Sequence, residues 1–230
     1  MSQPLQGLYA ITDPQLTPGD RVLSAAEAAL RGGATLLQYR DKPADADTRR
    51  HRAARLALLC KDYGARFIVN DDAALAAEVE ADGVHLGQSD GAVGRARMLL
   101  GDDKLIGVSC HGRLDLAQKA ADEGADYLAL GRFFESRTKP GAPPASLDTL
   151  REARRRFSLP LVAIGGVNPH NARQLIEAGA DLVAVIHALF GHADDADVEA
   201  AARQLHAAFP APPFKAVSYT HLRAHETKAN

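Results

Sequence analysis

The chain has 230 residues, of which 46% are hydrophobic and 24% charged, and its formal net charge is -2. This is the composition of a globular domain with a substantial core, and the near-neutral charge argues against a nucleic-acid or membrane partner. No apolar run reaches the roughly 18 residues that cross a bilayer, and the N-terminus lacks a signal-peptide pattern. The two cysteines, Cys60 and Cys110, predict neither a disulfide framework nor a metal site. We therefore expect a cytoplasmic protein.

Short apolar runs rich in β-branched residues alternate with stretches of helical periodicity, which predicts β-α-β units and a parallel sheet. The expected strands cover 8–12, 35–40, 66–70, 83–86, 104–109, 126–130, 161–165 and 181–186. Eight such units in about 200 residues favour a closed TIM (β/α)8 barrel. An open doubly wound sheet is disfavoured because no GxGxxG sequence follows the first strand.

Glycine–alanine pairs precede several of these strands and predict helix ends, because glycine suits the left-handed position after a helix. The pairs occupy 33–34, 64–65, 124–125 and 179–180. Asn168 and Pro169 predict the N-cap and the first residue of another helix.

The pattern stops near the C-terminus, where Pro210, Pro212 and Pro213 end the last helical stretch and no apolar periodicity follows. We predict one catalytic barrel domain over 1–209 and a disordered, non-native tail over 210–230.

The expected strand exits are mostly polar, and in a TIM barrel the chemistry lies in the loops after these exits. Gln38, Arg40 and Lys42 alternate along the second strand and are expected on one side. Arg40 and Lys42, with Lys139 from the loop after the sixth strand, would form a cationic cluster suited to a diphosphate. Asp71 and Asp90 follow two neighbouring strands and offer the carboxylates that Mg²⁺ prefers.

A second phosphate region is predicted at Gly165 and Gly166, where backbone N–H groups can approach an anion. Two phosphate regions on one rim imply two phosphorylated small-molecule substrates, or one bisphosphate. Other readings remain open: the glycines could only allow tight packing, Asp71 or Asp72 could cap a helix, and Ser109 could cap another. His85 is expected to pack in or against the barrel wall, and Cys110 with His111 is disfavoured as a nucleophilic dyad.

Seven sequence strings, in this order and at these strand positions, resemble the thiamine phosphate synthase family over residues 7–208. They are GLYAITD (7–13), QYRDK (38–42), VNDD (69–72), GVHLGQSD (83–90), GVSCH (107–111), ALGRFFESRTKPGAP (129–143) and VAIGGV (162–167).

The resemblance implies a transferase that condenses 4-amino-2-methyl-5-hydroxymethylpyrimidine diphosphate with thiazole phosphate, carboxylated or not. The products would be thiamine phosphate and diphosphate, formed by dissociative substitution assisted by Mg²⁺. By resemblance, the catalytic residues are Arg40, Lys42, Ser109 and Lys139, and the metal ligands are Asp71 and Asp90. The residues implied to bind the pyrimidine diphosphate are Gln38, Tyr39, Arg40, Asp41, Lys42, Asn70, Ser109 and Lys139. Those implied to bind the thiazole phosphate are Ser136, Arg137, Thr138, Gly166, Ile186 and His187.

The sequence departs from the family pattern at Tyr39, at Glu135 and Ser136, and at His187, where a serine is common. A thiazole tautomerase-like isomerase, a phosphosugar isomerase and a non-catalytic barrel that binds phosphorylated ligands are the alternatives. The combination of Arg40, Lys42, Asp71, Asp90 and Lys139 disfavours the tautomerase and the binding role. A phosphosugar isomerase would need an acid/base pair or metal-binding histidines at the strand ends, which the sequence does not clearly offer. Homo-oligomerisation is compatible with the sequence and is left open.

Overall fold

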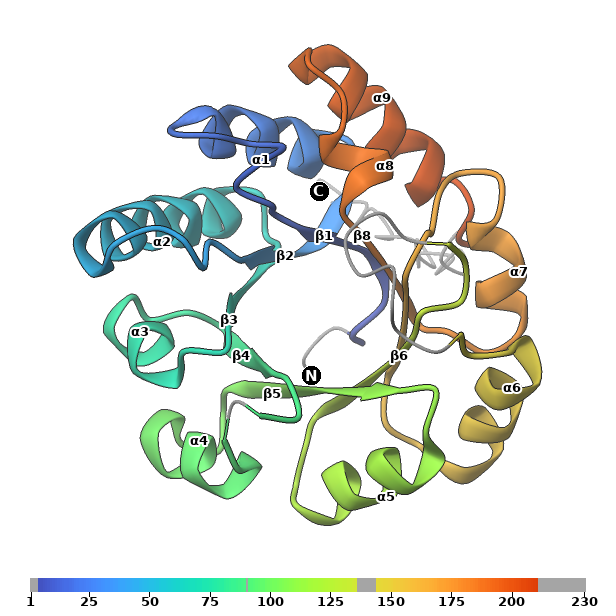
Figure 1. Cartoon of the computed structure of the whole chain (residues 1–230). Coiled ribbons are helices and arrows are strands. Elements are labelled where there is room, and N and C mark those ends of the chain that lie inside the picture. The colour runs from blue at the N-terminus through green and yellow to red at the C-terminus, as the bar shows by residue number, and fades with distance from the viewer. Residues whose placement is uncertain (1–3, 90, 136–143, 211–230) are drawn as a thin grey trace, which may run out of the picture.

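Parallel strands and helices alternate along the chain, and the strands close into a barrel with the helices around it (Figure 1). The computed structural model describes residues 4–89, 91–135 and 144–210. The strands are β1 (Gly7–Ile11), β2 (Ala34–Tyr39), β3 (Arg66–Asn70), β4 (Gly83–Leu86), β5 (Leu105–His111), β6 (Tyr127–Gly131), β7 (Leu161–Ile164) and β8 (Leu182–Val185). The helices are α1 (Arg21–Arg31), α2 (Ala46–Asp62), α3 (Ala73–Glu78), α4 (Val93–Leu100), α5 (Leu114–Asp122), α6 (Leu147–Arg156), α7 (Ala172–Glu177), α8 (His187–Phe190) and α9 (Asp195–His206).

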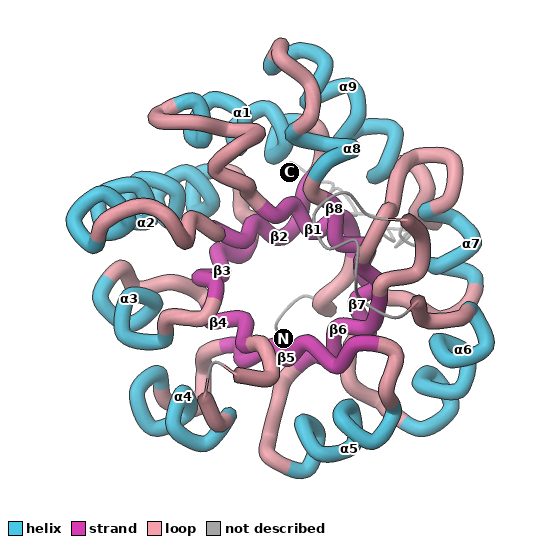
Figure 2. The backbone as a smooth tube through the Cα atoms, viewed as in Figure 1, coloured by secondary structure: helices cyan, strands magenta, loops and turns pink. Residues whose placement is uncertain are grey.

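The strand order around the barrel is the order along the chain, and β1 closes the circle by pairing in parallel with β8 (Figure 2). Each expected strand is present, with ends that differ by at most two residues. The predicted TIM barrel is thereby confirmed. Because parallel strands all end at the same rim, their exits meet at one mouth.

Two apolar layers hold the barrel together. The larger layer lies between strands and helices and uses small residues such as Ala25 and Ala29 of α1, both fully buried. The smaller layer fills the barrel interior with inward-facing side chains. Its members are Tyr9, Ile11, Leu36, Ile68, Tyr127, Ala129, Val162, Leu182 and Ala184. The inner layer therefore includes two tyrosines, whose hydroxyl groups need partners once they are buried.

The predicted helix ends are confirmed at Gly33, Gly64, Gly124 and Gly179, which all have positive φ. The predicted N-cap at Asn168 is wrong, because α7 begins at Ala172 and is preceded by Asn171. The Asn168 side chain accepts a hydrogen bond from His170 N at 2.9 Å, so it stabilises a turn before the helix.

At the opposite rim, where the strands begin, aspartates bind the backbone of the preceding strand. Asp181 Oδ2 accepts from Leu161 N at 2.8 Å and also pairs with Arg154 at 2.8 Å. Asp126 accepts from Ile106 N in the same way, at 2.7 Å. These contacts tie adjacent strands together far from the mouth. None of the helices in the described ranges is long and apolar enough to span a membrane.

Candidate active site

A cavity of about 300 Å³ opens at the mouth of the barrel, and residues from most strand exits line it. Apolar side chains such as Ile11, Val162 and Ile164 contribute to its lining. The predicted site residues that line it are Gln38, Arg40, Asn70, Ser109, Gly166, Ile186 and His187. The structure therefore brings residues predicted for both substrates into one cavity.

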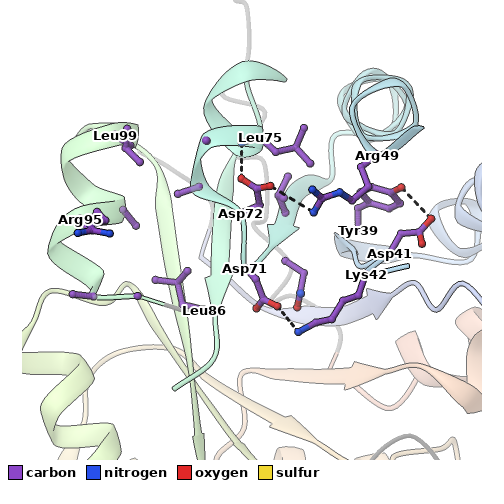
Figure 3. Close-up of a pocket in the computed structure, with 17 residues that line it drawn as sticks. Tyr39, Asp41, Lys42, Arg49, Asp71, Asp72, Leu75, Leu86, Arg95 and Leu99 are labelled. Carbon is purple, nitrogen blue, oxygen red and sulfur yellow. Dashed lines mark hydrogen bonds and ion pairs between the residues drawn. The ribbon is translucent and has the colours of Figure 1, made fainter. Parts of the chain in front are cut away.

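A neighbouring cavity of about 500 Å³ lies beside the exits of β2 and β3 (Figure 3). It is lined by the remaining described residues of the predicted site, namely Tyr39, Asp41, Lys42 and Asp71. Asn70 lines both cavities, so the two lie side by side on the same rim.

Alternation along β2 sends Gln38 inward and Tyr39 outward. Tyr39 is 2% exposed, and its hydroxyl lies 3.3 Å from Asp41 Oδ2. Asp41 in turn pairs with Arg52 of α2 at 3.0 Å. Burial raises the pKa of the Tyr39 phenol above its ordinary value, so it stays protonated. The tyrosine that departs from the family pattern thus lies outside the barrel mouth. The binding roles of Tyr39 and Asp41 remain predictions.

Arg40 is held at the mouth by the exit of β1. Its backbone N–H donates to Thr12 Oγ1 at 2.9 Å, and its guanidinium lies 3.6 Å from Asp13 Oδ2. Thr12 is itself 1% exposed. These contacts explain the GLYAITD string, whose last two residues position Arg40. Sequence reasoning recognised the string and missed this role.

Lys42 and Asp71 form an ion pair, with Lys42 Nζ 2.7 Å from Asp71 Oδ2 (Figure 3). Asp71 has a left-handed backbone, with φ at 64°. The next residue, Asp72, caps α3 by accepting from Leu75 N at 3.0 Å. The capping role left open by the sequence therefore falls to Asp72, and the Asp71 carboxylate faces Lys42.

The described residues hold no group of three or more histidine, cysteine, aspartate or glutamate side chains suited to a metal. Asp71 offers one carboxylate at the rim, with its side chain 22% exposed. Mg²⁺ commonly binds through one or two carboxylates together with water and substrate phosphate oxygens. The donor set therefore fits a Mg²⁺ ion shared with a diphosphate better than it fits an all-protein metal cage.

Gln38 reaches the mouth from β2 and Ser109 from β5, and hydrogen bonds from the barrel interior hold both side chains. Gln38 Nε2 donates to the Tyr9 hydroxyl at 2.7 Å, and Ser109 Oγ lies 2.8 Å from His85 Nε2. His85 lines the mouth cavity rather than only packing against the wall. Sequence reasoning missed Tyr9 as a contact of the site, because an apolar strand gives no signal for it.

Gly165 and Gly166 both have positive φ, at 99° and 67°. A Cβ atom on Gly166 would lie 2.3 Å from Glu135 O, and one on Gly165 would lie 2.2 Å from Arg132 Cβ. The segment after β6 packs so closely against Gly165 and Gly166 that this contact alone explains why both positions are glycine. Their role in binding a phosphate remains a prediction.

Cys110 is fully buried, and its burial raises the thiol pKa from 9.0 to about 12. Such a thiol is almost entirely protonated at neutral pH, which argues against a nucleophilic dyad with His111. The predicted residues Asp90, Ser136, Arg137, Thr138 and Lys139 lie outside the described residues.

Comparison with known proteins identifies the family. The thiamine monophosphate synthase family matches residues 8–189. A thiamine-phosphate synthase from Alcanivorax borkumensis is 66% identical over 205 residues, which cover 89% of this chain and 94% of the relative. One from Marinobacter nauticus is 53% identical over 208 residues, covering 90% and 93%. The solved structure of thiamine phosphate pyrophosphorylase from Pyrococcus furiosus is 35% identical, with a TM-score of 0.80, and the match covers 89% of this chain and 95% of that one. The chain therefore belongs to the thiamine monophosphate synthase family.

Proposed function

We propose that the protein condenses 4-amino-2-methyl-5-hydroxymethylpyrimidine diphosphate with a thiazole phosphate at the barrel mouth, with Mg²⁺ as cofactor. The observation that carries the proposal is the convergence of Gln38, Arg40, Asn70 and Ser109 on one cavity, next to the pair of Lys42 and Asp71. The family and two relatives named thiamine-phosphate synthase support it.

The reaction breaks the bond between the pyrimidine methylene carbon and the diphosphate oxygen, and the electron pair leaves with the diphosphate. The resulting cation is stabilised by the amino group and nitrogens of the pyrimidine ring, so no protein nucleophile is needed. The thiazole nitrogen then supplies the lone pair for the new carbon–nitrogen bond. The protein must mainly stabilise negative charge on the leaving group and hold the two rings in line.

Arg40 and Lys42 would stabilise the leaving diphosphate, because both lie at the exit of β2 on the same rim. Asp71 would hold Mg²⁺, with Asp90 as the second carboxylate implied by resemblance. When bound, Mg²⁺ would add positive charge beside the leaving group. Arg40 depends on Asp13 and Thr12 for its position, so the exit of β1 contributes indirectly.

The thiazole phosphate would bind along the exits of β7 and β8, where Gly166, Ile186 and His187 line the same cavity. This arc is separated from Arg40 only by β1. Ile11, at the end of β1, gives the cavity an apolar surface between the two groups. Such an arrangement suits two aromatic rings held next to each other.

Two further expectations belong to this proposal. A cytoplasmic location is expected for the enzyme. Residues 1–209 are proposed as the complete catalytic unit, so a chain that ends at residue 209 should retain full turnover.

The test is formation of thiamine phosphate from the two phosphorylated substrates, with Mg²⁺ and with EDTA. We expect product with Mg²⁺, none with EDTA, and recovery when MgCl₂ is added in excess of the chelator. If product formation is unaffected by EDTA, the transferase activity stands and the proposed role of Mg²⁺ is wrong. A folded protein that gives no product under either condition would overturn the function and favour an isomerase or a binding role.

A further inference from the structure

A chain of hydrogen bonds crosses the barrel interior beneath the mouth cavity. Gln38 Nε2 lies 2.7 Å from the Tyr9 hydroxyl, which lies 2.9 Å from the Tyr127 hydroxyl. The Tyr127 hydroxyl lies 3.1 Å from His85 Nδ1, and His85 Nε2 lies 2.8 Å from Ser109 Oγ. Tyr9, Tyr127 and His85, here called the buried chain, thus connect two residues of the candidate site.

The buried chain is held rigidly by packing. Tyr9 and Tyr127 meet edge to face with ring centroids 6.1 Å apart, and His85 stacks on Tyr127 at 5.6 Å. The Tyr127 ring lies directly over Gly107, where a Cβ atom would be 1.9 Å from Tyr127 Cζ. Tyr9 and Tyr127 are at most 1% exposed, so neither ring can turn toward solvent.

With a neutral His85 imidazole, the distances along the chain fit donation from Gln38 toward Ser109 or the reverse. An amide nitrogen cannot accept, so Gln38 donates to Tyr9. In the direction that we infer, Tyr9 donates its O–H to Tyr127, and Tyr127 donates to His85 Nδ1. In this direction a neutral His85 would carry its proton on Nε2 and donate it to Ser109 Oγ. Burial raises the pKa of both phenols, so each keeps the O–H that the series requires.

This direction decides what the two ends present to the mouth cavity. Because the Gln38 nitrogen is engaged below, its carbonyl oxygen is available to accept from a ligand. Because Ser109 already accepts from His85, its own O–H is available to donate. We infer that Tyr9, Tyr127 and His85 are positioning residues that keep Gln38 as an acceptor and Ser109 as a donor toward the pyrimidine ring. This inference rests on the proposed function.

The pattern suits an aminopyrimidine, which carries an N–H₂ donor and ring nitrogens that accept. An oxopyrimidine in its lactam form presents a carbonyl acceptor and an N–H donor, which is the opposite of the pattern that the two ends favour. Reversal needs each hydrogen bond of the buried chain to change direction together. The chain therefore favours the amino substrate through the coupling between its ends.

A role limited to satisfying buried hydroxyl groups would stabilise the barrel without coupling Gln38 to Ser109. A double-mutant cycle separates the two roles. The cycle measures kcat/KM for Gln38→Leu, for Ser109→Ala and for the double variant. It is measured once in the otherwise unchanged protein and once in the Tyr127→Phe background. Phenylalanine keeps the ring over Gly107 and removes only the hydroxyl. Tyr63→Phe, which removes an exposed hydroxyl bonded to Glu27 at 3.0 Å, is the matched control.

We expect the fold loss in kcat/KM of the double variant to differ from the product of the two single losses by a factor of at least about three. In the Tyr127→Phe background this factor should fall to about one. Tyr127→Phe alone should lower kcat more than it raises KM for the pyrimidine diphosphate, whereas Tyr63→Phe should change neither. A coupling that is unchanged by Tyr127→Phe would overturn the inference.

The His85 tautomer gives a second readout that needs no turnover and no variant. In the ¹⁵N-labelled protein, the ring nitrogen shifts should report a proton on Nε2. A proton on Nδ1 would show the opposite direction and overturn the inference. If the protein makes no thiamine phosphate but His85 carries its proton on Nε2, the proposed function is wrong while the inferred direction of the hydrogen bonds still holds.

Discussion

The predicted diphosphate contact and the predicted metal ligand are partners, since Lys42 Nζ lies 2.7 Å from Asp71 Oδ2. The Lys42 side chain is 57% exposed, so the pair is close to solvent. Exposed ion pairs of this kind contribute only about 0–1 kcal/mol. The lysine can therefore move from the carboxylate to a substrate phosphate at little cost in free energy.

Asp71→Asn should weaken the binding of Mg²⁺ at the rim without unfolding the barrel. An amide is a poorer ligand for Mg²⁺ than a carboxylate, so we expect the half-saturating Mg²⁺ concentration to rise about tenfold or more. The measurement is a titration of turnover with MgCl₂. Asp62→Asn, an exposed position at the end of α2, is the matched control and should leave the titration unchanged. An unaltered titration for Asp71→Asn would exclude it as a ligand.

Lys42→Ala tests the other partner. Loss of a preorganised charge at the leaving group should lower kcat on the order of 10²-fold. The unfolding free energy should change little, because the Lys42 side chain is 57% exposed. Lys61→Ala, an exposed position in the last turn of α2, serves as the control. Normal turnover with Lys42→Ala would assign the leaving-group role to other cations.

The sequence was sufficient to predict the fold because each strand carries its own apolar run and several helices end at a glycine. It was also sufficient to place Gln38 and Arg40 together, since both lie at the exit of β2 with alternating spacing. Lys42 is different: Arg40 directly follows the end of β2 at Tyr39, whereas Lys42 lies further along the loop, where strand alternation no longer fixes the direction of a side chain. Lys42 accordingly lines the neighbouring cavity.

The contact between Tyr9 and Tyr127 could not be predicted, because it joins residues 118 positions apart through the barrel interior. Each tyrosine looks like an ordinary core residue within its own strand. Gly107 gave no clear signal either, since its role is to leave space for the ring of Tyr127. These contacts form only when the barrel closes, so no local sequence pattern predicts them.

Gly166→Ala should damage both the loop after β7 and binding of the thiazole phosphate. The new Cβ would meet Glu135 O at 2.3 Å, on a backbone with φ at +67°. We expect the unfolding free energy to fall by about 1–3 kcal/mol. The KM for the thiazole phosphate should increase by a larger factor than the KM for the pyrimidine diphosphate. Urea unfolding and steady-state kinetics measure the two effects.

Gly94→Ala is the control for that variant, because it lies in α4 with no atom within 4 Å of the new Cβ. It should be neutral or stabilising by about 0.4–1 kcal/mol. Equal KM changes for both substrates in Gly166→Ala would argue against a thiazole-specific role for this loop.

Asp181→Ala should lower stability and leave catalysis intact. The variant removes the acceptor for Leu161 N and the partner of Arg154 at the rim opposite the mouth. Loss of the acceptor for a partly buried N–H costs about 1–3 kcal/mol. Urea unfolding should show that loss, while KM and kcat stay at the values of the unchanged protein below the unfolding transition. A selective rise in either KM would show that the two rims are coupled.

Cys110 should make the protein resistant to alkylation and sensitive to alkaline pH. Burial raises its pKa from 9.0 to about 12, so little thiolate exists at pH 8. Iodoacetamide at pH 8 should label Cys110 only when urea unfolds the chain, as read by mass spectrometry.

The pKa of Cys110 in the folded protein lies above its pKa in the unfolded chain, so the stability linked to this thiol is complete below pH 9 and is lost as the pH rises from 9 toward 12. Cys110→Ala should therefore lower stability at pH 8 through the small cavity it leaves, yet show a shallower decline in unfolding free energy above pH 9. Labelling of the native protein at the rate of a free cysteine, or parallel alkaline declines for both proteins, would contradict the assignment.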